Sequence, residues 1–111
     1  MSKTEEPMSP AKAICLAEYI QYAAGSIVSR ALVQKPVGSI TLFAFDAGQG
    51  LNEHTAPYDA YVQILDGESE LAIGGHIVNA KCGEMVLIPA NVSHSVNARQ
   101  RFKMLLTMIR G

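Results

Sequence analysis

Two histidines in similar local settings are the residues of this sequence best suited to chemistry. His94 follows the apolar run Glu84–Ile88 and a turn at Pro89–Asn91, and His54 precedes the apolar run Tyr58–Leu65. A neutral imidazole can offer a ring nitrogen to a metal ion or exchange a proton with a ligand. Because the two histidines come from separate expected strands, they predict a site only where folding brings those strands together.

Other candidate ligands around this pair are few. The third histidine, His76, follows the turn Gly74-Gly75, where a side chain usually faces solvent, so we expect it outside the site. The nearby oxygen donors are Glu53 and Asp59, and neither has a spacing that by itself directs it inward. A catalytic metal site uses at least three protein ligands. Two histidines therefore predict a weakly held ion, unless Asp59 or water completes the shell.

Turn residues divide most of the chain into short apolar runs, a pattern typical of an all-β protein. The runs end at glycine, at proline or at Asp-Gly. The expected strands are Ile27–Gln34, Ser39–Asp46, Tyr58–Leu65, Glu68–Ile73, His76–Ala80, Glu84–Ile88, Ser93–Asn97 and Phe102–Arg110. No segment between them could form a helical crossover, so the sequence predicts antiparallel strands in a sandwich or barrel.

The N-terminal segment has a different character. Ser9 and Pro10 are typical of a helix start, and Ala11–Glu18 is rich in helix-forming residues. We therefore expect a tail with a short helix over residues 1–25, followed by one β-barrel domain over residues 26–111.

Composition excludes several classes of function. The net charge of −1 gives no electrostatic basis for binding nucleic acid or an anionic membrane. No apolar run reaches the length of a membrane span, and the polar N-terminus has no apolar signal core, so we expect a cytoplasmic protein. Charged residues make up only 17% of the chain against a usual quarter, which indicates that part of the apolar surface lies in a pocket or an interface.

Two expected strands are apolar on both faces, namely Ile40–Phe45 and most of Phe102–Ile109. Such a strand has the barrel core on one side and requires a second cover on the other. The N-terminal helix could cover one outer face, and a second subunit could cover the rest. The pattern therefore predicts a homodimer.

The segment Gly83–Asn97 resembles the second conserved motif of the cupin family. That motif is a glycine, five residues, a proline, one residue, a glycine, two residues and a histidine, followed by an asparagine. In this chain Gly83, Pro89, Asn91, His94 and Asn97 stand at those positions, although Asn97 is one residue closer than usual. Asn91 replaces the turn glycine, and asparagine tolerates the left-handed backbone conformation that such a turn uses.

The segment Gly48–Gly67 resembles the first cupin motif in a degraded form. His54 matches the family's first metal ligand, and His94 matches its last. Ala56 and Ala60 stand where the family has its second histidine and its glutamate. The resemblance implies a double-stranded β-helix, or jelly-roll, cupin barrel that is often dimeric. It also implies a metal site that has lost two of its ligands.

Three functions follow from this reading, and we favour small-molecule binding in the barrel, with a weakly held metal at most. The expected pocket residues are His54, His94, Tyr58, Tyr61, Phe45, Met85, Met104 and Met108. The alternative is a metal-dependent enzyme of oxygenase or isomerase type, with both histidines binding iron, manganese, nickel or zinc. A variant of it uses a histidine as general acid or base without metal. The third function is a sensor module acting through a separate partner. Spacing alone does not separate binding from catalysis.

Overall fold

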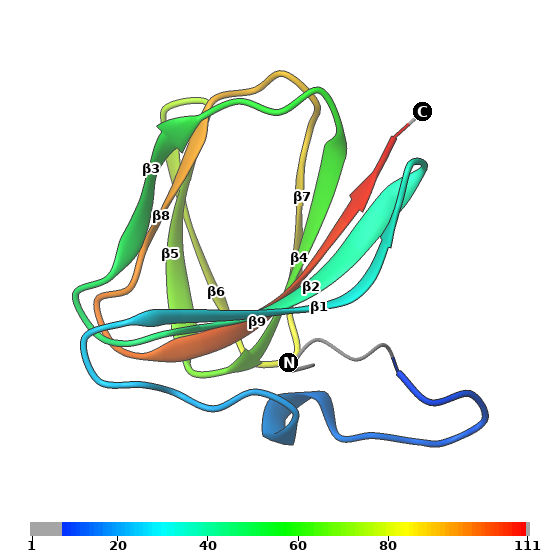
Figure 1. Ribbon diagram of the computed structural model, residues 1–111. Coiled ribbons are helices and arrows are strands. Elements are labelled where there is room, and N and C mark those ends of the chain that lie inside the picture. The colour runs from blue at the N-terminus through cyan, green and yellow to red at the C-terminus, as the bar shows by residue number, and fades with distance from the viewer. Residues whose placement is uncertain (1–7, 111) are drawn as a thin grey trace.

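The computed structural model describes residues 8–110, and these residues form two antiparallel β-sheets that face each other (Figure 1). The strands are β1 (Ile27–Lys35), β2 (Gly38–Phe45), β3 (Gly50–His54), β4 (Asp59–Asp66), β5 (Glu68–Ile73), β6 (His76–Lys81), β7 (Met85–Ile88), β8 (His94–Asn97) and β9 (Phe102–Ile109). One sheet has the order β1-β2-β9-β4-β7, and the other has the order β3-β8-β5-β6. The all-β barrel expected from the turn pattern is confirmed.

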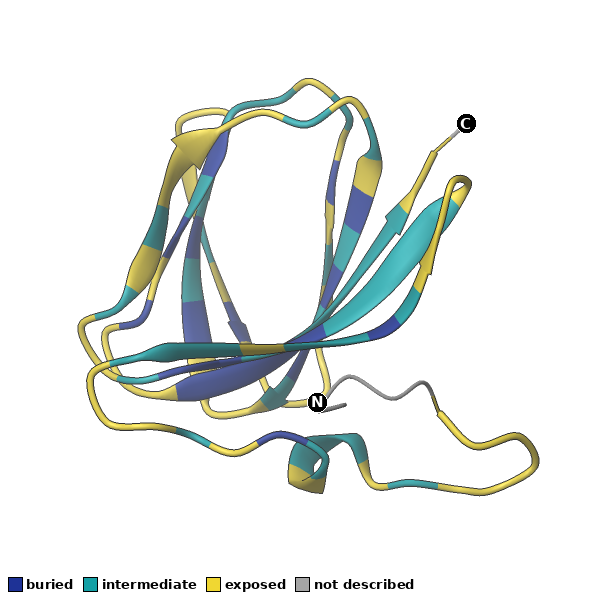
Figure 2. Ribbon diagram, viewed as in Figure 1, coloured by how far each residue is buried: buried dark blue, intermediate teal, exposed yellow. Residues whose placement is uncertain are grey.

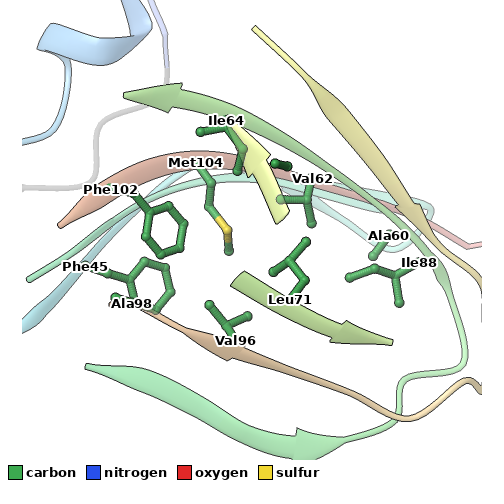
Figure 3. Close-up of a cluster of buried hydrophobic side chains, with 11 residues drawn as sticks. Phe45, Ala60, Val62, Ile64, Leu71, Ile88, Val96, Ala98, Phe102 and Met104 are labelled. Carbon is green, nitrogen blue, oxygen red and sulfur yellow. The ribbon is translucent and has the colours of Figure 1, made fainter. Parts of the chain in front are cut away.

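The main core lies between the two sheets, where strands from both contribute every second side chain. At one end of the barrel the rings of Phe45 and Phe102 stack with centroids 4.7 Å apart, and both residues are fully buried. Ala60 and Ile88 lie at the opposite end of the same cluster (Figure 3). The phenylalanine end of the barrel is thus filled by side chains.

A second, smaller cluster lies on the outer face of the five-stranded sheet. There Ile20, from the segment before β1, is buried against Leu42 and Ala44 of β2. The expected N-terminal helix is present only as one 3-10 turn, η1 (Leu16–Glu18), and Ala11 has a φ of 59°, which a helix does not allow. A short isolated helix is marginal in water, and contacts with the sheet determine the conformation of this segment instead.

Polar contacts fasten this N-terminal segment to the barrel. The Tyr22 hydroxyl donates to Asp66 over 2.5 Å, and the guanidinium of Arg101 lies 4.4 Å from the Tyr22 ring centroid. Burial and the neighbouring Asp66 carboxylate raise the pKa of Tyr22. Arg101 also pairs with Asp46 at 3.2 Å, and Asp46 accepts from the backbone N–H of Gly25. The segment and the barrel therefore form one packed unit.

The rest of the outer face of this sheet remains open (Figure 2). Four large apolar side chains on or beside it are between 49% and 69% exposed, namely Val37, Met85, Leu87 and Ile109.

Within residues 8–110, no helix has the length and apolar character needed to cross a membrane.

Candidate functional site

His54 and His94 lie directly opposite each other on the neighbouring strands β3 and β8. Their ring centroids are 4.3 Å apart, and the ring planes meet at 59°. His94 is 9% exposed, whereas His54 is an exposed residue at the end of its strand. In Figure 1 the end of β3 and the start of β8 lie together at the top of the barrel. The pair therefore lies at one end of the barrel, here called the barrel mouth, with the ring of His94 buried and that of His54 exposed.

A β-bulge directs His54 toward the barrel interior. On β3 and β8, Leu51 pairs with Val96 and His54 pairs with His94, so β3 advances three residues (51 to 54) while β8 advances two (96 to 94). In a regular strand Leu51 and His54 would face opposite sides, because side chains alternate. The extra residue on β3 turns His54 to the side of Leu51, which packs against the core.

Both rings have a defined tautomer. Nδ1 of His54 lies 2.7 Å from the carbonyl oxygen of Asn52, and Nδ1 of His94 lies 2.9 Å from the carbonyl oxygen of Val92. A carbonyl oxygen can only accept, so each neutral ring carries its proton on Nδ1 and its lone pair on Nε2. This backbone support is the kind that orients metal-binding histidines in proteins. The site therefore offers two oriented nitrogen acceptors.

The two family ligand positions occupied by alanine lie at the same end of the barrel. Ala60 is 5% exposed, faces the core and pairs with Ile88 and Met108 on the strands beside β4. Ala56 belongs to the loop after β3, and its carbonyl oxygen accepts from the backbone N–H of Asn91. Neither alanine side chain can ligate a metal ion. Two positions at this end of the barrel are thus apolar where the family pattern has polar ligands.

The nearby carboxylates are engaged elsewhere. Asp59 accepts from the backbone N–H of Ala90 at 2.9 Å, and Glu53 accepts from the hydroxyl of Ser93 at 2.6 Å. Across residues 8–110, no three histidine, cysteine, aspartate or glutamate side chains cluster as a metal site would require. The residues present therefore do not fit the closed or the open catalytic metal site of the family pattern.

The structure brings together only some of the residues predicted to line the pocket. Phe45 and Met104 face the interior but lie within the packed core, with exposures of 0% and 2%. Tyr61 and Met85 were expected to face the interior, and this is corrected: both lie on the outer face of the sheet. Their neighbours, including Val62, occupy the core side, so alternation turns these two outward.

Tyr58 lies away from the histidine pair, in contact with Arg110. The guanidinium carbon of Arg110 is 4.6 Å from the ring centroid, and Arg110 donates to the Tyr58 hydroxyl. His76 is exposed on β6, two strands from His94, since both pair with Ile73 of β5. One strand, β5, therefore separates His76 from His94.

The turn that leads into His94 has the conformation that the sequence predicted. Asn91 has a φ of 67°, in the left-handed region that asparagine tolerates better than most residues. Its backbone N–H donates to the carbonyl oxygen of Ala56 at 2.8 Å, which joins the two loops that carry the histidines. The turn thus helps to fix the position of one histidine relative to the other.

Comparison with known proteins identifies the fold independently. A family model described as a cupin domain matches residues 41–109. A conserved protein of unknown function from Streptococcus pyogenes is 30% identical, with a TM-score of 0.90, and the match covers 99% of this chain and 96% of that one. No curated protein matches the chain.

Two further solved structures are similar. A Cupin 2 conserved barrel domain protein from Leptotrichia buccalis is 42% identical, with a TM-score of 0.83, over 85% of this chain and 46% of that chain. The chain thus spans about half the length of that relative. A cupin superfamily protein from Desulfitobacterium hafniense shares the fold, with a TM-score of 0.89 and 24% identity over 98% and 100% of the two chains.

Proposed function

This chain belongs to the cupin family, and from that premise we propose that it binds a small molecule at the barrel mouth around His54 and His94. The single observation that carries the proposal is the histidine pair itself, with rings 4.3 Å apart and both lone pairs on Nε2. Two oriented acceptors beside apolar walls suit a small ligand with one polar end.

The surroundings of the pair support an open mouth. Two side chains at this end of the barrel, Ile73 and Met108, pack against the core but are only partly buried. The opposite end is closed by fully buried aromatic rings. A ligand would therefore enter beside the histidines and rest on apolar side chains, with its polar group donating to one or both rings.

A transition-metal ion would be weakly held in this site. Two nitrogens bound to one ion are at most about 4 Å apart, and rings with the spacing of His54 and His94 can meet that limit. Alanine at positions 56 and 60 leaves the remaining coordination to water. Iron, manganese, nickel or zinc could occupy such a site only at a raised concentration of free metal.

The second candidate is an enzyme that uses the same histidines. The observation in its favour is that each imidazole is held by a backbone carbonyl with a free base nitrogen, which is the arrangement of a general base. A metal-dependent form of oxygenase or isomerase type would require further ligands from the substrate. We keep this as the alternative because the chain supplies no third ligand among residues 8–110.

We further propose that the protein is a homodimer. The exposed side chains of Leu87 and Met85 on β7 and Ile109 on β9 lie on one outer face, with the half-buried Tyr61 between them in the sheet. Apolar patches of this kind mark interaction sites, and a twofold axis places identical apolar residues opposite each other. A second copy of the chain is therefore the partner that this face fits.

A thermal-shift screen tests the binding proposal, with divalent metals and a panel of small polar metabolites as probes. A genuine ligand at one hundred times its dissociation constant adds about 2.7 kcal/mol to stability, which shifts the melting temperature by several degrees. We expect His94→Ala to abolish the shift and His76→Ala to retain it. A shift that persists in the His94→Ala protein would place the ligand elsewhere.

A further inference from the structure

The five-stranded sheet carries a polar hollow that neither His54 nor His94 lines. Its volume is about 150 Å³, and it lies where the β1–β2 hairpin meets the end of β9. The lining residues are Gln34, Lys35, Pro36, Gly38, Ser39, Tyr58, Met108 and Arg110. Ordinary small-molecule pockets begin at roughly 300 Å³, so this hollow can hold one group of a ligand and not a whole ligand.

One row of cross-strand partners in the five-stranded sheet extends from the hollow to the barrel mouth. The row consists of successive cross-strand partners, namely Ile88, Ala60, Met108, Ser39 and Gln34. Cross-strand partners project to the same face of a sheet, so the hollow lies on the face that also bears the buried Ala60. Ser39 is two strands from Ala60, which corresponds to roughly 10 Å.

The hollow carries two positive charges and no acidic lining residue, because Lys35 and Arg110 are its only charged members. Within residues 8–110 neither cation forms an ion pair, whereas Arg99 and Arg101 each pair with a carboxylate. The guanidinium of Arg110 is held against the Tyr58 ring, which orients its planar fork. The Arg110 guanidinium therefore has a defined orientation, and within residues 8–110 neither Lys35 nor Arg110 has a counter-ion.

We propose that this hollow binds an oxyanion, the carboxylate or phosphate end of the small molecule received at the barrel mouth. Arg110 suits the two oxygens of such a group, and Lys35 adds a point charge. The Ser39 hydroxyl and the Gln34 amide are further donors. The inference rests on the proposed function for the identity of the ligand, but the oxyanion contact depends only on the residues of the hollow.

NMR titration of the full-length, nitrogen-15-labelled chain with inorganic phosphate and with acetate tests this inference. We expect saturable shifts of the backbone amides of Gly38 and Ser39, and the tighter of the two probes identifies the preferred oxyanion. Arg110→Gln should raise the dissociation constant at least tenfold. Arg110→Lys keeps the charge and loses the planar guanidinium, so its dissociation constant should lie between those of wild type and Arg110→Gln. Arg99→Gln makes the same charge change in the β8–β9 loop, where Arg99 pairs with Glu70, and should leave the constant within twofold of wild type.

Two further readouts separate this inference from the proposed function. His94→Ala should retain phosphate binding at the hollow and lose the response of the histidine rings to Zn²⁺, while Arg110→Gln should show the reverse. The inference is overturned if no saturable shift occurs at Gly38 and Ser39, or if Arg99→Gln weakens binding as much as Arg110→Gln does. A wild-type protein that binds phosphate at the hollow but shows no response of its histidine rings to Zn²⁺ would contradict only the histidine site.

Discussion

Leu51 and His54 face the same side of β3 although they stand an odd number of residues apart, because a bulge lies between them. The carbonyl oxygen of Asn52, two residues before His54, lies 2.7 Å from its Nδ1, as the carbonyl oxygen of Val92 does at 2.9 Å for His94. The bulge thus determines the direction of the His54 ring, and the local carbonyl determines its tautomer. The geometry of the histidine pair depends on both.

Exchanging positions 53 and 54, as Glu53→His with His54→Glu, should therefore disable the site while β3 keeps its length and its histidine. The histidine would then stand where Glu53 contacts Ser93, on the face of β3 opposite to that of Leu51. We expect the Zn²⁺ affinity to fall at least tenfold, about 1.4 kcal/mol, in a calorimetric titration. Glu53→Ala is the matched control, because it removes the contact with Ser93 and keeps His54 in place. Equal Zn²⁺ affinities in the exchanged variant and the control would show that the bulge does not orient the ring.

Ala60→Glu should restore a metal ligand at the family's glutamate position. Without metal, a carboxylate in this buried position should lower the free energy of unfolding by at least about 2 kcal/mol. Added Mn²⁺ or Zn²⁺ should recover that stability, because an ion that binds only the folded state stabilises it. Ala60→Gln has a similar size and should be destabilised without recovery. Melting temperatures with and without metal check this, and equal recovery in both variants would contradict it.

Asp46 should make the protein sensitive to acid. The backbone N–H groups of Gly25 and Ala47, followed by the Arg101 side chain, hold the pKa of Asp46 below its ordinary value of 3.8. A carboxyl with a depressed folded-state pKa stabilises the fold above its unfolded pKa and loses that contribution as the pH falls. Asp46→Asn should therefore melt below wild type near pH 6, and the difference should shrink as the pH falls below the ordinary value of 3.8. A constant difference across this range would show that Asp46 does not stabilise the fold through its charge.

Leu87→Asp should convert the proposed dimer to a monomer. The substitution places a charge in the apolar outer face of the five-stranded sheet, and desolvating that charge opposes association. Light scattering after size-exclusion chromatography measures the mass. Ile77→Asp changes a similarly exposed apolar residue on the other sheet and should leave the dimer intact. A monomeric wild-type protein would contradict the proposal directly.

Sequence reasoning predicted the strands that have turn residues at both ends and apolar residues at alternate positions. It also predicted the turn at Asn91, because the spacing of the motif and the tolerance of asparagine agree. It did not predict β3, whose residues after Leu51 are polar and exposed. A strand held in place mainly by pairing with its neighbour leaves little hydrophobic pattern to detect.

The faces of individual side chains were harder to predict than the strands. Tyr61 and Met85 were placed in the pocket, but one step of register separates the two faces of a strand. The bulge in β3 and the hollow at Arg110 each depend on pairing between segments far apart in the sequence. Lys35 and Arg110, two cations at the ends of expected strands, were the available signal for the hollow, and only the folded register brings them together.

The measurement that tests the central claim most directly is a Zn²⁺ titration followed on the ring nitrogens of nitrogen-15-labelled histidine. Before addition, His54 and His94 should both show the tautomer with the proton on Nδ1. During the titration both Nε2 signals should shift together with one dissociation constant, while those of His76 remain unchanged. Independent responses of the two rings, or a response confined to His76, would contradict a shared site at the barrel mouth.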